Sequence, residues 1–143
     1  PGGTNDLMTN DRPAAFTFTK LVVHDLDAMA DYYCDVFGLF RGTRDQFENG
    51  VGGEPIDEVA LTAKPGDKYG ALTLLKFLKR PGVREDETIL GFTTPDLASL
   101  LLRVERAGGT RLGPIKEHAD HGIRVAFVRD PEGHINELVE LRS

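Results

Sequence analysis

The chain repeats itself, and the spacing of the repeat limits the folds that it can adopt. Asp25 opens a segment that closes at Gly38, and Asp96 opens another that closes at Gly109, 71 residues further along in both cases. Apolar residues recur at i, i+3, i+4, i+7 and i+11 from Leu26, and the same offset repeats the first four of these positions. The pattern predicts two amphipathic helices, each with an aspartate as N-cap and a glycine at its C-terminal end.

Stretches typical of β-strands flank both predicted helices. They span 16–23, 39–47, 57–63 and 71–79 in the first half, and 88–94, 110–115, 123–129 and 135–141 in the second. Each half is therefore predicted to fold as β-α-β-β-β. We expect an α+β protein of curved mixed sheets with helices on one face, which leaves the other face free to line a cleft. The predicted modules span 16–82 and 87–142 within a single domain, and residues 1–15 are expected to form a flexible leader.

Composition excludes several classes of function. The 17 Lys and Arg residues against 23 Asp and Glu give a formal charge of −6, which argues against nucleic acid as the main partner. No apolar run approaches the roughly 18 residues of a membrane span, and the N-terminus does not resemble a signal peptide. The single cysteine, Cys34, excludes an internal disulfide and suits a reducing compartment, so we expect a cytoplasmic protein.

Two stretches resemble motifs of one protein family. DLDAMADYYCDVFGL, residues 25–39, resembles the first helix of the glyoxalase, bleomycin-resistance and extradiol-dioxygenase group, the vicinal oxygen chelate superfamily. AFVRDPEGHINELVEL, residues 126–141, resembles the closing hairpin of that family. The resemblance covers about residues 16–142 and implies the paired β-α-β-β-β fold, and it also implies a homodimer. It does not define the reaction, because the family includes isomerases, lyases, dioxygenases and metal-free drug-binding proteins.

The resemblance also indicates where metal enzymes of the family hold a divalent ion. Those positions fall on Phe18, Lys76, Ile89 and Glu137, with Leu75 as the alternative to Lys76. Phenylalanine and isoleucine have no donor atom, and a lysine ammonium has no lone pair. One carboxylate does not hold Zn²⁺, Ni²⁺ or Fe²⁺ with useful affinity, so we expect no metal cofactor and disfavour a divalent metal.

Lys76 and Glu137 admit two interpretations if they converge on the cleft floor. They form either a buried ion pair without a catalytic role, or an acid–base pair in a metal-independent lyase or isomerase. In the second case Glu137 takes a proton beside a carbonyl group and Lys76 stabilises the developing oxyanion.

Apolar side chains favour a different function, the binding of a small aromatic or carbonyl-containing molecule. Phe16, Phe18 and Ile89 are predicted to line the cleft, His24 to lie at its rim, and His121 to lie over it in a surface loop. The equally simple interpretation is that the apolar residues belong to the core.

A third possibility is a metal lyase or dioxygenase with atypical ligands. It would combine Glu137 with His24, His118 or His121. The remaining histidine, His134, lies in the D-P-E-G-H turn and is expected to be exposed to solvent.

Overall fold

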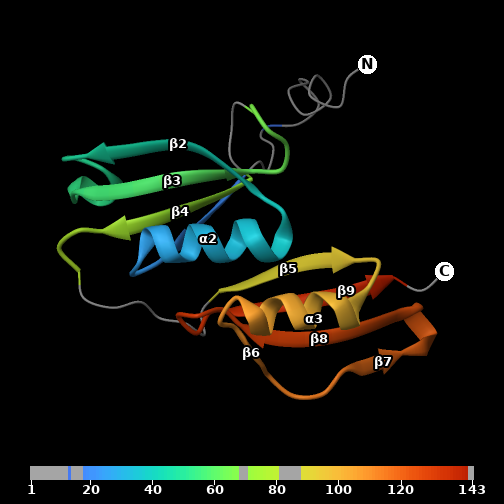
Figure 1. Cartoon of the computed structure of the whole chain (residues 1–143). Helices are drawn as coiled ribbons and strands as arrows, with labels where there is room; N and C mark the ends of the chain where they lie inside the picture. The colour runs from blue at the N-terminus through green and yellow to red at the C-terminus, as the bar shows by residue number, and fades with distance from the viewer. Residues whose placement is uncertain (1–12, 14–17, 68–70, 81–87, 142–143) are drawn as a thin grey trace.

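The two halves of the chain form two separate sheets, each with one helix along one face (Figure 1). The computed structural model describes residues 13, 18–67, 71–80 and 88–141. Module 1 contains β1 (Thr19–Val22), α2 (Leu26–Phe37), β2 (Phe40–Phe47), the short helix η1 (Val51–Gly53), β3 (Ile56–Thr62) and β4 (Leu72–Phe77). Module 2 contains β5 (Ile89–Thr94), α3 (Leu97–Arg106), β6 (Thr110–Arg111), β7 (Lys116–His118), η2 (Ala119–His121), β8 (Ile123–Arg129) and β9 (Ile135–Leu141).

Both sheets are mixed, as the sequence predicts. The strand orders are β1-β4-β3-β2 and β5-β9-β8-β6, with β7 also paired to β8. The first strand of each module runs parallel to the last, and the other pairs are antiparallel. The α+β class and the β-α-β-β-β order are therefore confirmed. The strand predicted over 110–115 is wrong in its extent, because β6 ends at Arg111 and the amide of Leu112 makes a last bond to Phe127 of β8, while the additional strand β7 follows it.

Both helices begin as predicted, because aspartate side chains satisfy amide groups of the first turn. Asp25 accepts a hydrogen bond from the amide of Ala28, and Asp96 accepts one from the amide of Ser99. The second helix ends differently from the prediction. Gly108, with a φ of +92°, takes the left-handed conformation, whereas a Cβ at Gly109 would lie 2.6 Å from a methyl group of Val104.

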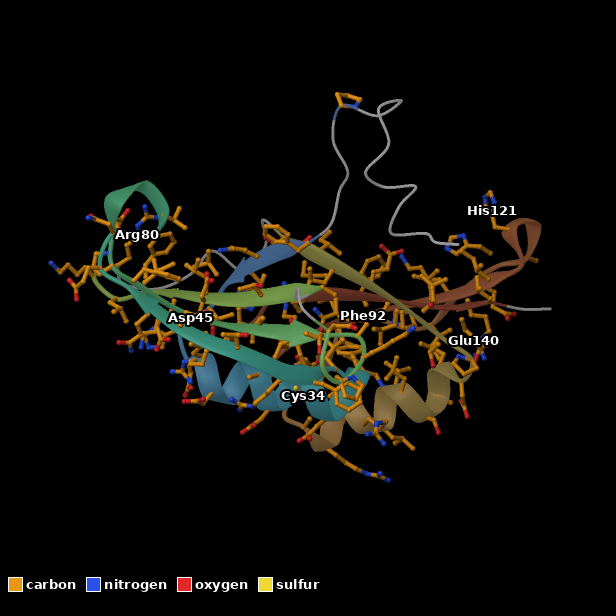
Figure 2. The ribbon with its side chains drawn as sticks, turned by 90° about the horizontal axis from the view of Figure 1, so that it is seen from above. Cys34, Asp45, Arg80, Phe92, His121 and Glu140 are labelled. Atoms are coloured by element: carbon orange, nitrogen blue, oxygen red, sulfur yellow. The ribbon has the colours of Figure 1, made fainter. Side chains whose placement is uncertain are left out.

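One apolar core joins the two modules, because both helices lie on the same side of the two sheets (Figure 2). The helices contribute their predicted stripes to it, namely Leu26, Met29, Ala30, Tyr33, Leu97, Leu100, Leu101 and Val104. The opposite faces of both sheets therefore open toward a common side. No helix among the described residues is long and apolar enough to cross a membrane.

A buried polar network also joins the modules. The Asp130 carboxylate accepts hydrogen bonds from the Tyr33 hydroxyl and the His134 ring, both at 2.8 Å. The other ring nitrogen of His134 lies 3.0 Å from the carbonyl oxygen of Val22 in module 1. The expectation that His134 is exposed is wrong, because its side chain is enclosed between the modules and the residue is 1% exposed.

Candidate functional site

Strand alternation places Lys76 and Glu137 on opposite sides of the molecule. In β9, Asn136 and Leu138 are fully buried on the helix side, so Glu137 between them points to the open side. In β4, Leu74 belongs to the core beneath the helices, and Lys76 faces the same way two residues later. The predicted couple of Lys76 with Glu137 is therefore wrong. Leu75 faces the open side, but it lies in a small separate apolar cluster.

The register of the parallel strand pairs shows where the prediction went wrong. Gly91 of β5 is the partner of Glu137 in β9, and Lys20 of β1 is the partner of Thr73 in β4. Since the 71-residue offset relates Lys20 to Gly91, Thr73 takes the position equivalent to Glu137. The predicted register along β4 was therefore displaced by three residues.

The open side carries an ion pair that sequence reasoning missed. The Lys20 ammonium lies 2.8 Å from a Glu58 carboxylate oxygen, and the pair reaches across β4 from β1 to β3. The Lys20 side chain is 37% exposed and that of Glu58 is 16% exposed. The sequence held a signal for Lys20, because it lies two residues after Phe18 and strand alternation places both on one face.

An apolar pocket of about 330 Å³ lies at the seam between the modules. Residues from both modules line it, namely Thr19, Leu39, Ala71, Leu72, Ile89, Leu90, Gly91 and Phe92. The structure therefore places Ile89 in a pocket, although the residue is 55% exposed. Phe18 directly precedes Thr19 and is 48% exposed. Phe16 and most of the predicted leader lie outside the described residues.

Gly91, which lines this pocket, is exposed on the open side of β5. A Cβ at position 91 would meet no heavy atom within 4 Å, and the backbone there does not have a positive φ. Neither a close contact nor the backbone conformation therefore requires glycine at this position. A glycine inside a strand also weakens that strand. Because Gly91 has no side chain, β5 presents no side chain between the seam and the neighbouring Glu137.

Comparisons with known proteins agree with this architecture. Residues 15–138 match the Glyoxalase/Bleomycin resistance protein/Dioxygenase superfamily. The chain belongs to this superfamily. No curated protein matches the sequence.

Solved structures of the superfamily share the fold at low sequence identity. A glyoxalase family protein from Bacillus cereus has 18% identity and a TM-score of 0.76, over 95% of this chain and 99% of that one. The trypanothione-dependent glyoxalase I of Leishmania major has 20% identity and a TM-score of 0.66, over 86% of this chain and 84% of that one. A glyoxalase-related enzyme from Fulvimarina pelagi has 23% identity and a TM-score of 0.59, over 87% of this chain and 86% of that one. At these identities the likeness establishes the fold alone.

The donors at the corrected positions do not fit the metal site that the superfamily resemblance implies. With Thr73 in place of Lys76, the four positions hold Phe18, Thr73, Ile89 and Glu137, which together offer one carboxylate and one hydroxyl. Divalent transition metals in proteins require several nitrogen, sulfur or carboxylate ligands. Among the described residues, no group of three or more His, Cys, Asp or Glu side chains could hold a metal ion.

The histidines proposed as atypical ligands do not join Glu137. His118 and His121 are exposed on β7 and η2. Figure 2 shows His121 at the far tip of module 2, away from Phe92 at the seam. The structure therefore does not bring His121 over the candidate site.

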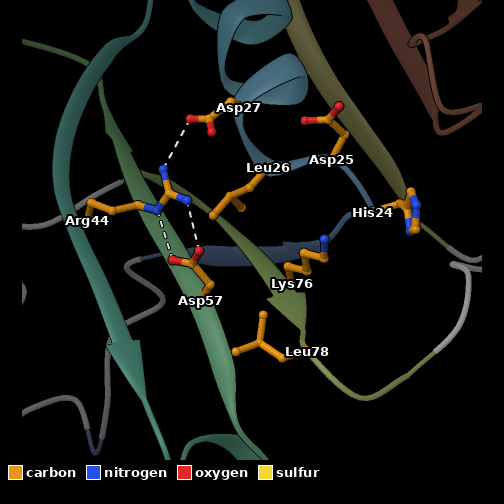
Figure 3. A pocket seen from close by; sticks show the side chains of 8 residues that line it. All are labelled: His24, Asp25, Leu26, Asp27, Arg44, Asp57, Lys76 and Leu78. Carbon is orange, nitrogen blue, oxygen red and sulfur yellow. Dashed lines mark hydrogen bonds and ion pairs between the residues drawn. The ribbon is translucent and has the colours of Figure 1, made fainter.

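His24 and Lys76 both line a second pocket (Figure 3). This cavity of about 310 Å³ lies on the helix side, where α2 begins, and is lined by His24, Asp25, Leu26, Asp27, Arg44, Asp57, Lys76 and Leu78. None of these residues lines the seam pocket. Two predicted site residues thus lie together at a place that the sequence did not indicate.

Proposed function

We propose that this member of the superfamily binds a small, largely apolar molecule in the seam pocket, with Glu137 as its main polar contact and without a metal ion. The observation that carries the proposal is the space at Gly91, beside Glu137. A strand-interior glycine that neither packing nor backbone conformation requires is explained by the room that it leaves for a ligand.

The lining of the seam pocket defines the ligand chemistry. Leu39, Leu72 and Phe92 offer apolar walls, and ligand sites combine such walls with a few well-placed polar groups. A volume of about 330 Å³ suits a compact molecule such as a substituted aromatic ring. The half-buried Glu137 carboxylate accepts hydrogen bonds, so the ligand carries a hydroxyl or N–H group at that end.

A second candidate function uses the same carboxylate as a base. Glu137 does not line the seam pocket, but it points to the open side beside Gly91, which does, and it has no protein hydrogen-bond partner among the described residues. It is therefore available to a carbon acid that extends from the pocket past Gly91. A lyase or isomerase acting on a carbonyl compound would then need no metal for proton removal. Lys20, and not Lys76, is the lysine on the same side of the sheets.

Titration of the labelled 143-residue chain with phenol, benzaldehyde and toluene, followed by NMR, tests the binding function. We expect saturable shifts at the amides of residues 89–92, and Gly91→Leu is expected to abolish them by filling the space. Thr93→Leu is the matched control, because Thr93 faces the same side of β5 but does not line the pocket. Binding that is absent in the wild-type chain, or that persists in Gly91→Leu, contradicts the proposal.

Glu137→Gln separates the two roles of the carboxylate. If Glu137 accepts a hydrogen bond from the ligand, phenol affinity falls several-fold while toluene affinity is unchanged. If the protein turns over a carbonyl compound, loss of turnover with retained binding identifies Glu137 as the base. Unchanged turnover contradicts that role.

A further inference from the structure

The second pocket lies apart from the seam, at the end of sheet β1-β4-β3-β2 where α2 begins (Figure 3). Apolar side chains on β4, Leu72 and Leu74, face α2 and belong to the core. Lys76 is the next residue on that face, so a charged side chain follows where the apolar core ends. The ammonium of Lys76 is thereby directed into a cavity of about 310 Å³.

The neighbouring charges in this pocket are already paired with each other. Nε and one Nη atom of Arg44 each lie 2.8 Å from an Asp57 carboxylate oxygen, and Asp57 is 6% exposed. The other Nη of Arg44 donates to Asp27 at 3.1 Å, and Gln46 donates to Asp57 at 3.3 Å. The carboxylate of Asp25 accepts from the helix backbone. The acids that line the pocket are therefore all engaged.

Lys76 makes no such close contact. It is the cross-strand neighbour of Asp57 and its charge attracts that carboxylate, yet it forms no hydrogen bond or close ion pair with any described residue. The ring of His24, across the pocket, also forms none. Residue Lys76 is half-buried, and an ammonium that loses hydration without gaining a hydrogen bond is unfavourable.

We propose that this pocket binds a small organic anion, whose oxyanion group contacts Lys76 and His24 and whose apolar part lies against Leu26 and Leu78. An ammonium offers three donors and no acceptor, and its hydrogen bonds to a charged oxygen are the strong kind. Leu26 and Leu78 supply the apolar wall of the cavity. Carboxylates and phosphates share the required oxyanion, and the test below distinguishes them.

Titration of the 143-residue chain with sodium acetate, sodium benzoate and inorganic phosphate at constant ionic strength tests the proposal. We expect saturable NMR shifts at the amides of residues 24–27 and 76–78. A carboxylate site with an apolar wall binds benzoate more tightly than acetate, whereas a phosphate site prefers inorganic phosphate to both. Lys76→Met is expected to weaken the binding of the preferred anion at least tenfold, which corresponds to about 1.4 kcal/mol of binding free energy. Lys116→Met, at an exposed position on β7, is the matched control and keeps the wild-type affinity.

The proposal is overturned if none of the three anions binds saturably, or if Lys76→Met binds as tightly as the wild-type chain. Equal shifts with sodium chloride also overturn it, because they indicate screening and not a site. Circular dichroism verifies that Lys76→Met folds. If it does not, Leu78→Trp takes its place, since the larger side chain occupies the cavity and is expected to reduce binding without removing the cation.

Discussion

His134 joins the modules by its Nε2 atom, which lies 3.0 Å from the carbonyl oxygen of Val22 at the end of β1. Its Nδ1 atom lies 2.8 Å from the carboxylate of Asp130. A backbone carbonyl only accepts hydrogen bonds, so Nε2 donates to Val22, and a protonated ring, with a second donor at Nδ1, also satisfies the Asp130 carboxylate. Both contacts therefore favour the imidazolium form where the two halves of the chain meet.

Stability is expected to fall as the pH rises through the folded-state pKa of His134. Burial lowers that pKa, but the hydrogen bond and charge of Asp130 and the Val22 carbonyl outweigh burial, so the pKa stands above its ordinary value of 6.5. Protonated His134 therefore contributes fully to the free energy of unfolding below its unfolded-state pKa, and this contribution is lost as the pH rises above its folded-state pKa. Urea unfolding across this range, in wild type and His134→Gln, measures it. A loss of stability in the alkaline range that is equal in both proteins contradicts the prediction.

Tyr33→Phe is expected to destabilise the protein by about 1–3 kcal/mol, because it removes a buried donor from the Asp130 carboxylate. Burial and the negative charge of Asp130 raise the pKa of Tyr33, so its hydroxyl keeps the proton that it donates. Tyr32→Phe is the matched control, since the Tyr32 hydroxyl has only a 3.3 Å contact with Asn136. Urea unfolding compares them. A larger loss of unfolding free energy in Tyr32→Phe than in Tyr33→Phe would contradict the stabilising role of the hydrogen bond from Tyr33 to Asp130.

Gly91→Ala is expected to stabilise the protein by about 0.5–1 kcal/mol, because the methyl group enters open space and the unfolded chain loses freedom. Gly38→Ala is the contrasting variant. Gly38 ends α2 with a φ of +72°, so alanine there is strained and destabilising. Thermal unfolding of the two variants measures both effects. A destabilised Gly91→Ala would mean that a requirement of the fold, and not a ligand, explains the glycine.

Metal analysis is expected to find no stoichiometric divalent ion in the purified protein. The reason is the donor set, in which Glu137 has Thr73, Phe18 and Ile89 where family ligands are expected. Added Zn²⁺ or Ni²⁺ should leave the melting temperature unchanged, since a ligand stabilises only the state that binds it. One tightly held equivalent per chain that is lost in Glu137→Gln would refute the metal-independent function.

The sequence predicted the fold well because its strongest signals are periodic. The stripe that begins at Leu26 recurs 71 residues later, and the capping aspartates marked where both helices begin. The homodimer and the cytoplasmic location remain predictions that the fold does not test.

The candidate site was harder to predict, because it depends on register. The β9 strand follows the Asp130 turn at a fixed spacing, which located Glu137, but no such landmark precedes β4. A slip of an odd number of residues moves a side chain to the other face of a sheet, and this error placed Lys76 opposite Glu137. The burial of His134 was also hidden, since its partner Val22 lies 112 residues away in the chain.

The missing side chain at position 91 has a consequence for how this protein can diversify. The surface beside Glu137 changes with a single residue, Gly91, at which an added Cβ strains no backbone and meets no neighbour. Selection could therefore retune the size of the accepted molecule through one codon, in small steps from alanine upward, while the scaffold stays intact.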